Sequence, residues 1–136
     1  MFELLPEDQQ PKPTLLNPNA DDLKKAKVLG VGCKVQYIKE YDVITLYNND
    51  IMIVEDNTGY CTETNPIFIN DKPQPNKTNI LPENSLSISK FSKATVLTST
   101  DPQLKKGDKV GYKKASGLVL PDQSEIISDT QIFFKV

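Results

Sequence analysis

The sequence Val43-Ile44-Thr45-Leu46-Tyr47 is rich in β-branched and aromatic residues, which favours a strand. Asn48-Asn49-Asp50 follows and is typical of a turn, and Ile51-Met52-Ile53-Val54 then predicts the returning strand of a hairpin. Short strand-like runs of this kind continue to the C-terminus, with no helical spacing of apolar residues. We therefore predict an all-β protein with the architecture of a small β-barrel or sandwich.

The two halves of the chain repeat one another at an offset of about 66 residues, which indicates duplication of a small domain. Four pairs of segments carry the repeat: Ala26-Lys27-Val28-Leu29 with Ala94-Thr95-Val96-Leu97, Ile38–Asp42 with Leu104–Asp108, Met52–Asp56 with Leu118–Asp122, and Thr64, Ile67 and Phe68 with Thr130, Ile132 and Phe133. The apolar pairs Leu15-Leu16 and Ile80-Leu81, each inside a polar stretch with prolines, are also expected to correspond.

This repeat divides the chain into a first unit over residues 1–64 and a second unit over residues 65–136. The first unit is expected to be incomplete, because residues 1–25 read as an N-terminal loop with no clear opening strand. The second unit is expected to open with a strand at Pro66–Asn70 and to carry a mobile loop over residues 71–92. Tyr60–Asn70 is also a candidate for a strand shared by both units.

Composition excludes several classes of function. The net charge is -2 with no basic stripe, which argues against nucleic-acid binding, and no apolar run is long enough to span a membrane. Histidine is absent and no nucleophile or phosphate-binding motif occurs, so we expect no enzymatic activity, no catalytic residues, no metal site and no cofactor. Cys33 and Cys61 are read as free thiols of a cytoplasmic protein, with a disulfide between them left open.

Two stretches of the second half resemble the GroES (chaperonin-10) family of co-chaperonins. Leu104-Lys105-Lys106-Gly107-Asp108-Lys109-Val110-Gly111-Tyr112 is similar to the family's "V-G-D-x-V-x-Y" strand, and Ser128-Asp129-Thr130-Gln131-Ile132 to its closing "E-S-D-I-L-A-x-V" strand. In the first half, Lys27-Val28-Leu29-Gly30-Val31-Gly32 is similar to the "V-L-x-V-G" strand, while Tyr41 replaces the turn glycine. The resemblance implies a GroES-like small β-barrel, internally duplicated, in a tandem or partly duplicated member of the family.

The resemblance also implies a function. Members of this family cap a large chaperonin ring of the GroEL kind through mobile loops, each of which inserts an apolar tripeptide into a groove. The candidate partner-binding residues are Asn79, Ile80 and Leu81 and, less securely, Thr14, Leu15 and Leu16. Weak single sites of this kind bind strongly together in a homo-oligomeric ring. Alternatively, each apolar pair packs on the protein's own sheet and holds its loop in place, without binding a partner.

A second function of a different class stays open, namely a structural β-barrel subunit of a virion or another large assembly. The divergent sequence is compatible with a phage-encoded protein that works in the host cytoplasm. Fold alone does not decide between the two functions. Asp42 and Asp108 are interpreted as turn-forming residues at the entry of a strand rather than as catalytic acids.

Overall fold

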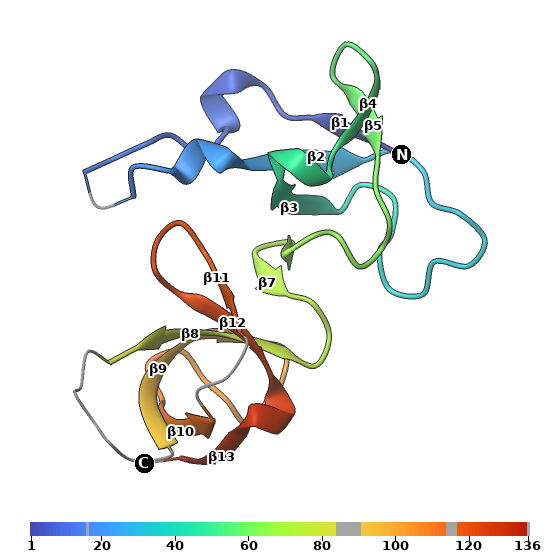
Figure 1. Cartoon of the computed structure of the whole chain (residues 1–136). Helices are drawn as coiled ribbons and strands as arrows, with labels where there is room; N and C mark the ends of the chain where they lie inside the picture. The colour runs from blue at the N-terminus through green and yellow to red at the C-terminus, as the bar shows by residue number, and fades with distance from the viewer. Residues whose placement is uncertain (16, 84–90, 114–116, 136) are drawn as a thin grey trace. The chain divides into compact units, whose positions relative to one another are not determined.

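The structure is a computed structural model that describes residues 1–15, 17–83, 91–113 and 117–135. It separates into two compact units, Met1–Asp71 and Lys72–Val136, which are described one by one (Figure 1). The division therefore falls seven residues after the predicted boundary between residues 64 and 65. Regular structure in the described residues consists of β-strands and single-turn 3₁₀ helices, so the all-β class is confirmed.

Unit 1 is an antiparallel sheet with the strand order β4-β5-β1-β2-β3-β6. Its strands are β1 (Phe2–Leu4), β2 (Leu23–Val28), β3 (Val43–Tyr47), β4 (Met52–Glu55), β5 (Thr58–Tyr60) and β6 (Phe68–Ile69). Three 3₁₀ turns lie between them: η1 (Glu7–Gln9), η2 (Ala20–Asp22) and η3 (Asn48–Asp50). The hairpin predicted at residues 43–54 is thus only half correct, because β4 pairs with β5 and not with β3.

Unit 2 begins with β7 (Lys72–Pro73) and contains an antiparallel sheet with the order β11-β12-β8-β9-β10-β13. The strands of this sheet are β8 (Lys77–Pro82), β9 (Phe91–Ser99), β10 (Lys109–Lys113), β11 (Leu118–Val119), β12 (Glu125–Ser128) and β13 (Ile132–Lys135), with the 3₁₀ turn η4 (Asp129–Gln131) before β13. The sheets are open and do not close into a barrel, so the predicted barrel is wrong at this level.

The strand order of the two units is the same, with β4, β5, β1, β2, β3 and β6 matched by β11, β12, β8, β9, β10 and β13. The register agrees as well: Phe2 pairs with Val28 in unit 1, and Ile80 pairs with Val96 in unit 2. β1 is therefore the opening strand that the sequence did not reveal. The equivalent of Ile80 is Phe2 rather than Leu15, which corrects the expected match between the two apolar pairs.

The predicted opening strand of the second unit, Pro66–Asn70, is also placed differently. Its middle forms β6, which pairs with β3 of unit 1, where Ile44 lies opposite Ile69 and Thr45 opposite Phe68. β6 thus takes the place beside β3 that β13 takes beside β10 in unit 2. The match of Phe68 with Phe133 in the sequence repeat agrees with this placement.

Each unit buries its own apolar core, built from matching positions of the repeat. In unit 1 the core consists of Phe2, Ala26, Val28, Ile38, Ile44 and Leu46, and in unit 2 of Ile80, Ala94, Val96, Val110, Tyr112 and Ile127. The central strands β3, β8 and β10 each bury three consecutive residues, so both faces of these strands are covered at their middle. Burial of apolar surface at ~25 cal/mol per Å² is the main stabilising term for both units.

The turn that enters β3 or β10 is the same in both units and confirms the structural role of its aspartate. The Oδ2 atom of Asp42 accepts a hydrogen bond from the Lys39 backbone N–H at 2.9 Å, and that of Asp108 accepts one from the Lys105 N–H at 2.9 Å. The carbonyl of each aspartate then accepts a bond from the N–H of Val28 (2.9 Å) or Val96 (2.8 Å). Both side chains are thus used in stabilising a turn.

Candidate partner-binding site

The segment between β1 and β2, residues 5–22, is called the β1–β2 arm here. Figure 1 shows it running out from the sheet and back again. Its base is held to β2: the Leu5 N–H donates to the Lys25 carbonyl at 3.0 Å, and Ala20 is buried. Pro6 and η1 then direct the chain away, with the Gln9 N–H bonded to the Pro6 carbonyl at 2.9 Å. The arm is therefore held to the sheet near both of its ends, at Leu5 and at Ala20.

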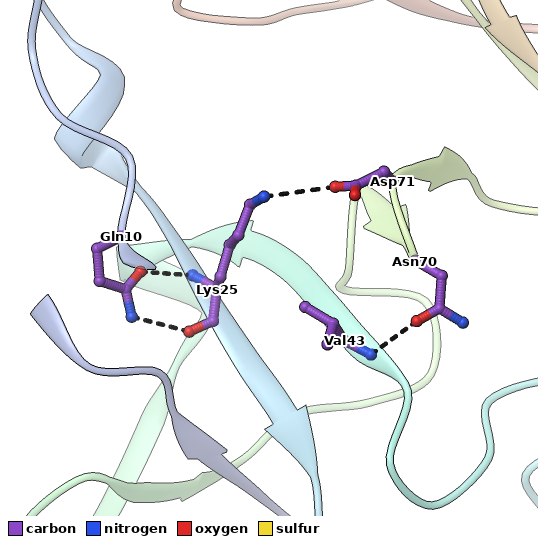
Figure 2. Close-up of polar contacts among 5 residues, drawn as sticks. All are labelled: Gln10, Lys25, Val43, Asn70 and Asp71. Carbon is purple, nitrogen blue, oxygen red and sulfur yellow. Dashed lines mark hydrogen bonds and ion pairs between the residues drawn. The ribbon is translucent and has the colours of Figure 1, made fainter. Parts of the chain in front are cut away.

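Gln10 is the strongest anchor at this base (Figure 2). Its Nε2 donates to the carbonyls of Leu5 and Lys25, both at 2.9 Å, and its Oε1 accepts from the Lys25 N–H at 2.8 Å. Only 8% of Gln10 is exposed, so these bonds are shielded from water. Buried polar groups with satisfied hydrogen bonds fix local structure, because losing a partner leaves a costly unpaired group.

The tip of the arm presents an apolar side chain to solvent. Thr14 and Asn17 hydrogen-bond to each other through their backbones at 3.0 and 3.2 Å, and the Thr14 Oγ1 accepts a further bond from the Asn17 N–H at 3.0 Å. Leu15 lies between them with a relative exposure of 102%, the highest of the large apolar residues described. Leu16, the other apolar candidate of this pair, lies outside the described residues. A single exposed leucine is common on protein surfaces, so Leu15 is a candidate contact because of its place at the tip of the arm and not because of its exposure alone.

The other set of candidate residues lies in a strand. Residues 77–82 form β8, so the prediction of one mobile loop over residues 71–92 is wrong for this part, and residues 84–90 lie outside the described chain. Ile80 is fully buried in the core and Asn79 is 4% exposed. The Asn79 Nδ2 donates to the Ser124 Oγ at 3.0 Å and to the Glu125 carbonyl at 3.2 Å. Only Leu81, at 44% exposure, faces solvent to a large degree.

A second apolar surface lies at one edge of each sheet. In unit 1 the edge strand β4 exposes Met52 (70%), Ile53 (49%) and Val54 (57%). The matching edge strand of unit 2, β11, exposes Leu118 and Val119. Edge strands with exposed apolar side chains pair readily with other strands, so they are usually blunted or covered.

The loop between β2 and β3 is held in place by one carboxylate. The Oε2 atom of Glu63 accepts hydrogen bonds from the backbone N–H groups of Gln36, Tyr37 and Ile38 at 3.0, 2.8 and 3.0 Å. Burial raises the pKa of Glu63, but the three donors outweigh it and the pKa is lowered overall. The same carboxylate contributes to a raised pKa of Tyr37, whose larger cause is burial. Glu63 therefore has a structural role, because its carboxylate fixes the backbone of the β2–β3 loop.

Metal-ligating side chains and the two cysteines are considered together here. No cluster of three or more His, Cys, Asp or Glu residues capable of holding a metal ion occurs in the part of the chain that the structure describes. Cys33 is exposed and Cys61 is partly buried, and both are free thiols, as expected. Burial raises the pKa of Cys61, which keeps this thiol protonated and poorly reactive. A small cavity of about 70 Å³ beside Cys61 is lined by core residues such as Phe2 and Ile44 and by polar residues such as Glu63.

Comparison with protein-family models, with curated proteins and with solved structures gives no match to this chain. In the described residues, none of the helical turns has the length or apolar character required to cross a membrane. The case for function therefore depends on the geometry of the chain itself and on the sequence resemblance.

Sequence reasoning found Leu15 but missed the residues that position it. Gln10 stands in a polar run with four prolines nearby, and nothing in that composition distinguishes a buried amide from a solvated one. β1 was missed because Phe2-Glu3-Leu4 is only a three-residue alternation next to the N-terminus. Its one usable signal was the apolar–polar–apolar pattern, which places Phe2 and Leu4 on the same side of a strand.

Proposed function

We propose that the protein is a divergent co-chaperonin, a non-enzymatic lid that docks on a GroEL-like chaperonin ring through the β1–β2 arm. The observation that carries this proposal is the complete exposure of Leu15 at the tip of an arm whose base is anchored. An apolar side chain in this position has no contact to lose on binding. Its burial in a partner's groove would contribute roughly 1.5–3 kcal/mol for each arm.

The place of the arm in the fold supports the same function. In the GroES family the mobile loop follows the first strand and precedes the "V-L-x-V-G" strand. Here the arm follows β1 and precedes β2, which leads into Leu29-Gly30-Val31-Gly32. The resemblance therefore fits Thr14, Leu15 and Leu16 better than Asn79, Ile80 and Leu81. We assign the docking role to the first set and a core role to Ile80.

The energetics require several arms to act together. One leucine and its neighbours give a weak contact, and the arm loses conformational freedom when it docks. Arms carried by a ring of copies would bind as one multivalent ligand, which raises affinity without new contacts. The exposed apolar edges β4 and β11 support self-association of this kind. In this proposal the protein works in the cytoplasm, together with the chaperonin and without a cofactor.

A direct test compares the wild type with Leu15→Ser for binding to purified GroEL in the presence of ATP. We expect the substitution to weaken binding at least tenfold, because the loss of each apolar contact is multiplied over the arms of a ring. Lys12→Ala, an exposed change in the same arm, serves as the matched control and should bind like the wild type. Complexes are measured by sedimentation and by electron microscopy. Equal binding of Leu15→Ser and wild type would show that the arm is not the contact.

The alternative function, a structural subunit of a virion or another assembly, is favoured by the apolar edge strands alone. It predicts that the arm is ordered against neighbouring copies and is unaffected by a chaperonin. Hydrogen exchange of residues 11–19 separates the two functions. In the co-chaperonin these amides exchange fast in the free protein and become protected when GroEL and ATP are added. In a structural subunit they are protected in the assembled protein before any chaperonin is present.

A further inference from the structure

Unit 2 contains a cavity of about 240 Å³ between the loop that joins β9 to β10 and the end strand β13. Its lining combines apolar side chains with two carboxylates: Leu104, Ile132, Phe133, Phe134, Asp101 and Asp129. The two phenylalanines are 52% and 48% exposed, so the cavity is open to solvent. Its volume is more than three times the 70 Å³ of the cavity beside Cys61, which leaves room for a side chain or a small molecule.

The sequence repeat explains why this space is open in unit 2. In the alignment of the two units, Asp129 corresponds to Glu63 and Gln103 corresponds to Tyr37. In unit 1, the Tyr37 ring packs on the core and its hydroxyl donates to the Glu63 carbonyl at 3.2 Å, while the Glu63 carboxylate reaches the backbone of the loop. In unit 2, Gln103 is exposed and the shorter Asp129 is bonded to Thr78. The two side chains that fill this place in unit 1 therefore have no counterpart in unit 2.

The two carboxylates are held in place by one chain of hydrogen bonds. The Asp101 Oδ1 accepts from the Gln103 N–H at 2.9 Å, and the Asp129 Oδ1 accepts from the Thr78 hydroxyl. Thr78 in turn bonds to the Ser99 Oγ at 2.8 Å, and that oxygen accepts from the Asp101 N–H at 3.0 Å. Among the described residues, the second oxygen of each carboxylate has no donor of its own. Both aspartates are thus fixed in position and can still accept hydrogen bonds.

The charge and the donors around the cavity favour a cation over an anion. Lys135 also lies in the lining, but its Nζ is paired with the Asp108 Oδ2 at 3.2 Å. The N–H groups of the loop are already used, because Gln103 donates to the Asp101 side chain and Leu104 donates to the Asp101 carbonyl at 3.1 Å. An anion would therefore meet two carboxylates and no available loop N–H.

We propose that this cavity binds a guanidinium group on an apolar stem, which is the chemistry of an arginine side chain. A guanidinium is planar and has five donors in a fork, so it can bond to Asp101 and Asp129 together while it stacks on a phenylalanine ring. The chain itself contains no arginine, so the group must come from another molecule, either free arginine or an arginine of a partner protein. This site does not depend on the proposed co-chaperonin function.

Titration of the full-length protein with ethylguanidinium chloride, followed through the backbone amide signals in NMR, tests the site. We expect saturable shifts of the Gln103, Leu104 and Phe133 amides, with the equivalent amides of Tyr37 and Ile38 in unit 1 unchanged. Ethylammonium chloride is the ligand control and should bind about threefold more weakly, because it lacks the planar fork of donors. If no shifts occur around the cavity, or if the two cations bind equally, the proposal is wrong.

A substitution at one carboxylate tests the role of the charge. Asp101→Asn keeps an oxygen for the Gln103 N–H and removes the charge, so it should weaken ethylguanidinium binding about fivefold, the upper end for a partly exposed ion pair. Asp122→Asn is the matched control, because Asp122 accepts the Ser124 N–H at 3.0 Å in another turn of unit 2 and lies outside the lining. It should bind like the wild type. Equal binding by Asp101→Asn, with the amide signals of a folded unit 2, would overturn the proposal.

A substitution that closes the cavity tests the place of binding. Gln103→Tyr introduces the ring that unit 1 has at the equivalent position, and Gln103 is exposed, so the fold should tolerate the change. We expect this variant to lose ethylguanidinium binding, whereas Gln103→Ser should retain it. If Gln103→Tyr binds like the wild type, the ligand lies elsewhere on the protein and the proposal fails.

A last comparison distinguishes the two sources of the guanidinium. Free L-arginine and a short peptide with one central arginine are titrated in the same way. Binding of the peptide about tenfold tighter than that of free arginine indicates a partner protein, because an extended segment beside β13 adds main-chain contacts. Equal binding indicates the free amino acid, and both results support the site. If neither ligand binds, the proposal is overturned, and the Leu15→Ser test of chaperonin binding is unaffected.

Discussion

Tyr41 and Gly107 occupy the same turn position in the two units, and both have a left-handed backbone, with φ of 71° and 92°. The N–H of each donates to the valine carbonyl of the preceding strand at 2.8 Å, Val28 in one unit and Val96 in the other. Glycine adopts this conformation without a steric penalty, whereas a side chain pays about 1–2 kcal/mol. Unit 1 therefore keeps a strained residue where unit 2 has the unstrained one.

The first prediction concerns this pair. Gly107→Ala should destabilise unit 2 by about 1–2 kcal/mol, and no steric clash contributes, because an added Cβ meets nothing within 4 Å. Tyr41→Ala should cost less than about 1 kcal/mol, since the strain is already present and only the stacking of Lys27 on the ring, at 5.3 Å, is lost. Urea unfolding followed by circular dichroism measures both. Equal losses in the two variants would contradict this assignment of strain.

The second prediction separates a core residue from its exposed neighbour. Ile80→Ala should destabilise unit 2 by about 2–5 kcal/mol, because it opens a cavity in a fully buried site. Leu81→Ala, the matched control, should cost well under that amount, since Leu81 is 44% exposed. Both are measured by urea unfolding. If the two substitutions cost the same, Ile80 is not the core residue that its burial indicates.

The repeat shows what the sequence could and could not predict. Val28 and Val96 and the aspartates of the β3 and β10 turns were found, because strand alternation and turn chemistry are local properties. Residues 77–82 were misread as part of a loop, since Thr78 and Asn79 are polar and prolines lie nearby. Their burial is made possible by distant partners: Thr78 bonds to the Ser99 Oγ at 2.8 Å and to Asp129, and Asn79 to Ser124. Such partners are invisible in a local pattern.

The candidate site was predictable only in part, for a related reason. Leu15 can be found from the sequence alone, because it is apolar in a polar stretch. Gln10 cannot be found in this way, because its side chain bonds to the backbone at Leu5 and Lys25, and every residue has such backbone groups. The role of Gln10 as an anchor therefore became visible only once β1 and β2 were placed.

The third prediction is a pH dependence of unit 1. The pKa of Glu63 is lowered in the folded protein, so its carboxylate contributes stability that is present above the unfolded-state value and is lost as the pH falls through the folded-state value. Glu63→Gln removes the charge that accepts the three N–H groups of the β2–β3 loop. The variant should therefore be less stable than the wild type at pH 7, and this difference should shrink as the pH falls below 4.

Thermal unfolding at pH 7, 5, 4 and 3, followed by circular dichroism, measures this effect. The control is Glu40→Gln, which changes an exposed carboxyl group of the same loop. Asp108, whose pKa is lowered chiefly by the Lys105 N–H and further by Lys135, gives unit 2 an acid dependence of the same sign. That dependence stays in every variant, so the comparison isolates Glu63. If the difference in unfolding temperature between Glu63→Gln and the wild type stays constant with pH, the charged Glu63 carboxylate does not stabilise the β2–β3 loop.

The last prediction concerns the apolar edge strand β4 and the proposed self-association. Met52 and Val54 are exposed on an edge strand that has no neighbour on its outer side among the described strands of unit 1. Met52→Lys together with Val54→Lys places two charges on this strand, and such charges block edge-to-edge pairing. The double variant should sediment as a smaller species than the wild type while it keeps the circular dichroism spectrum of the folded protein. Asn57→Lys, in the exposed turn after β4, adds the same kind of charge beside the strand and should leave the oligomer intact. If the double variant retains the wild-type sedimentation coefficient, β4 is not the contact between copies, and β11, with Leu118 and Val119 exposed, is the next edge to change.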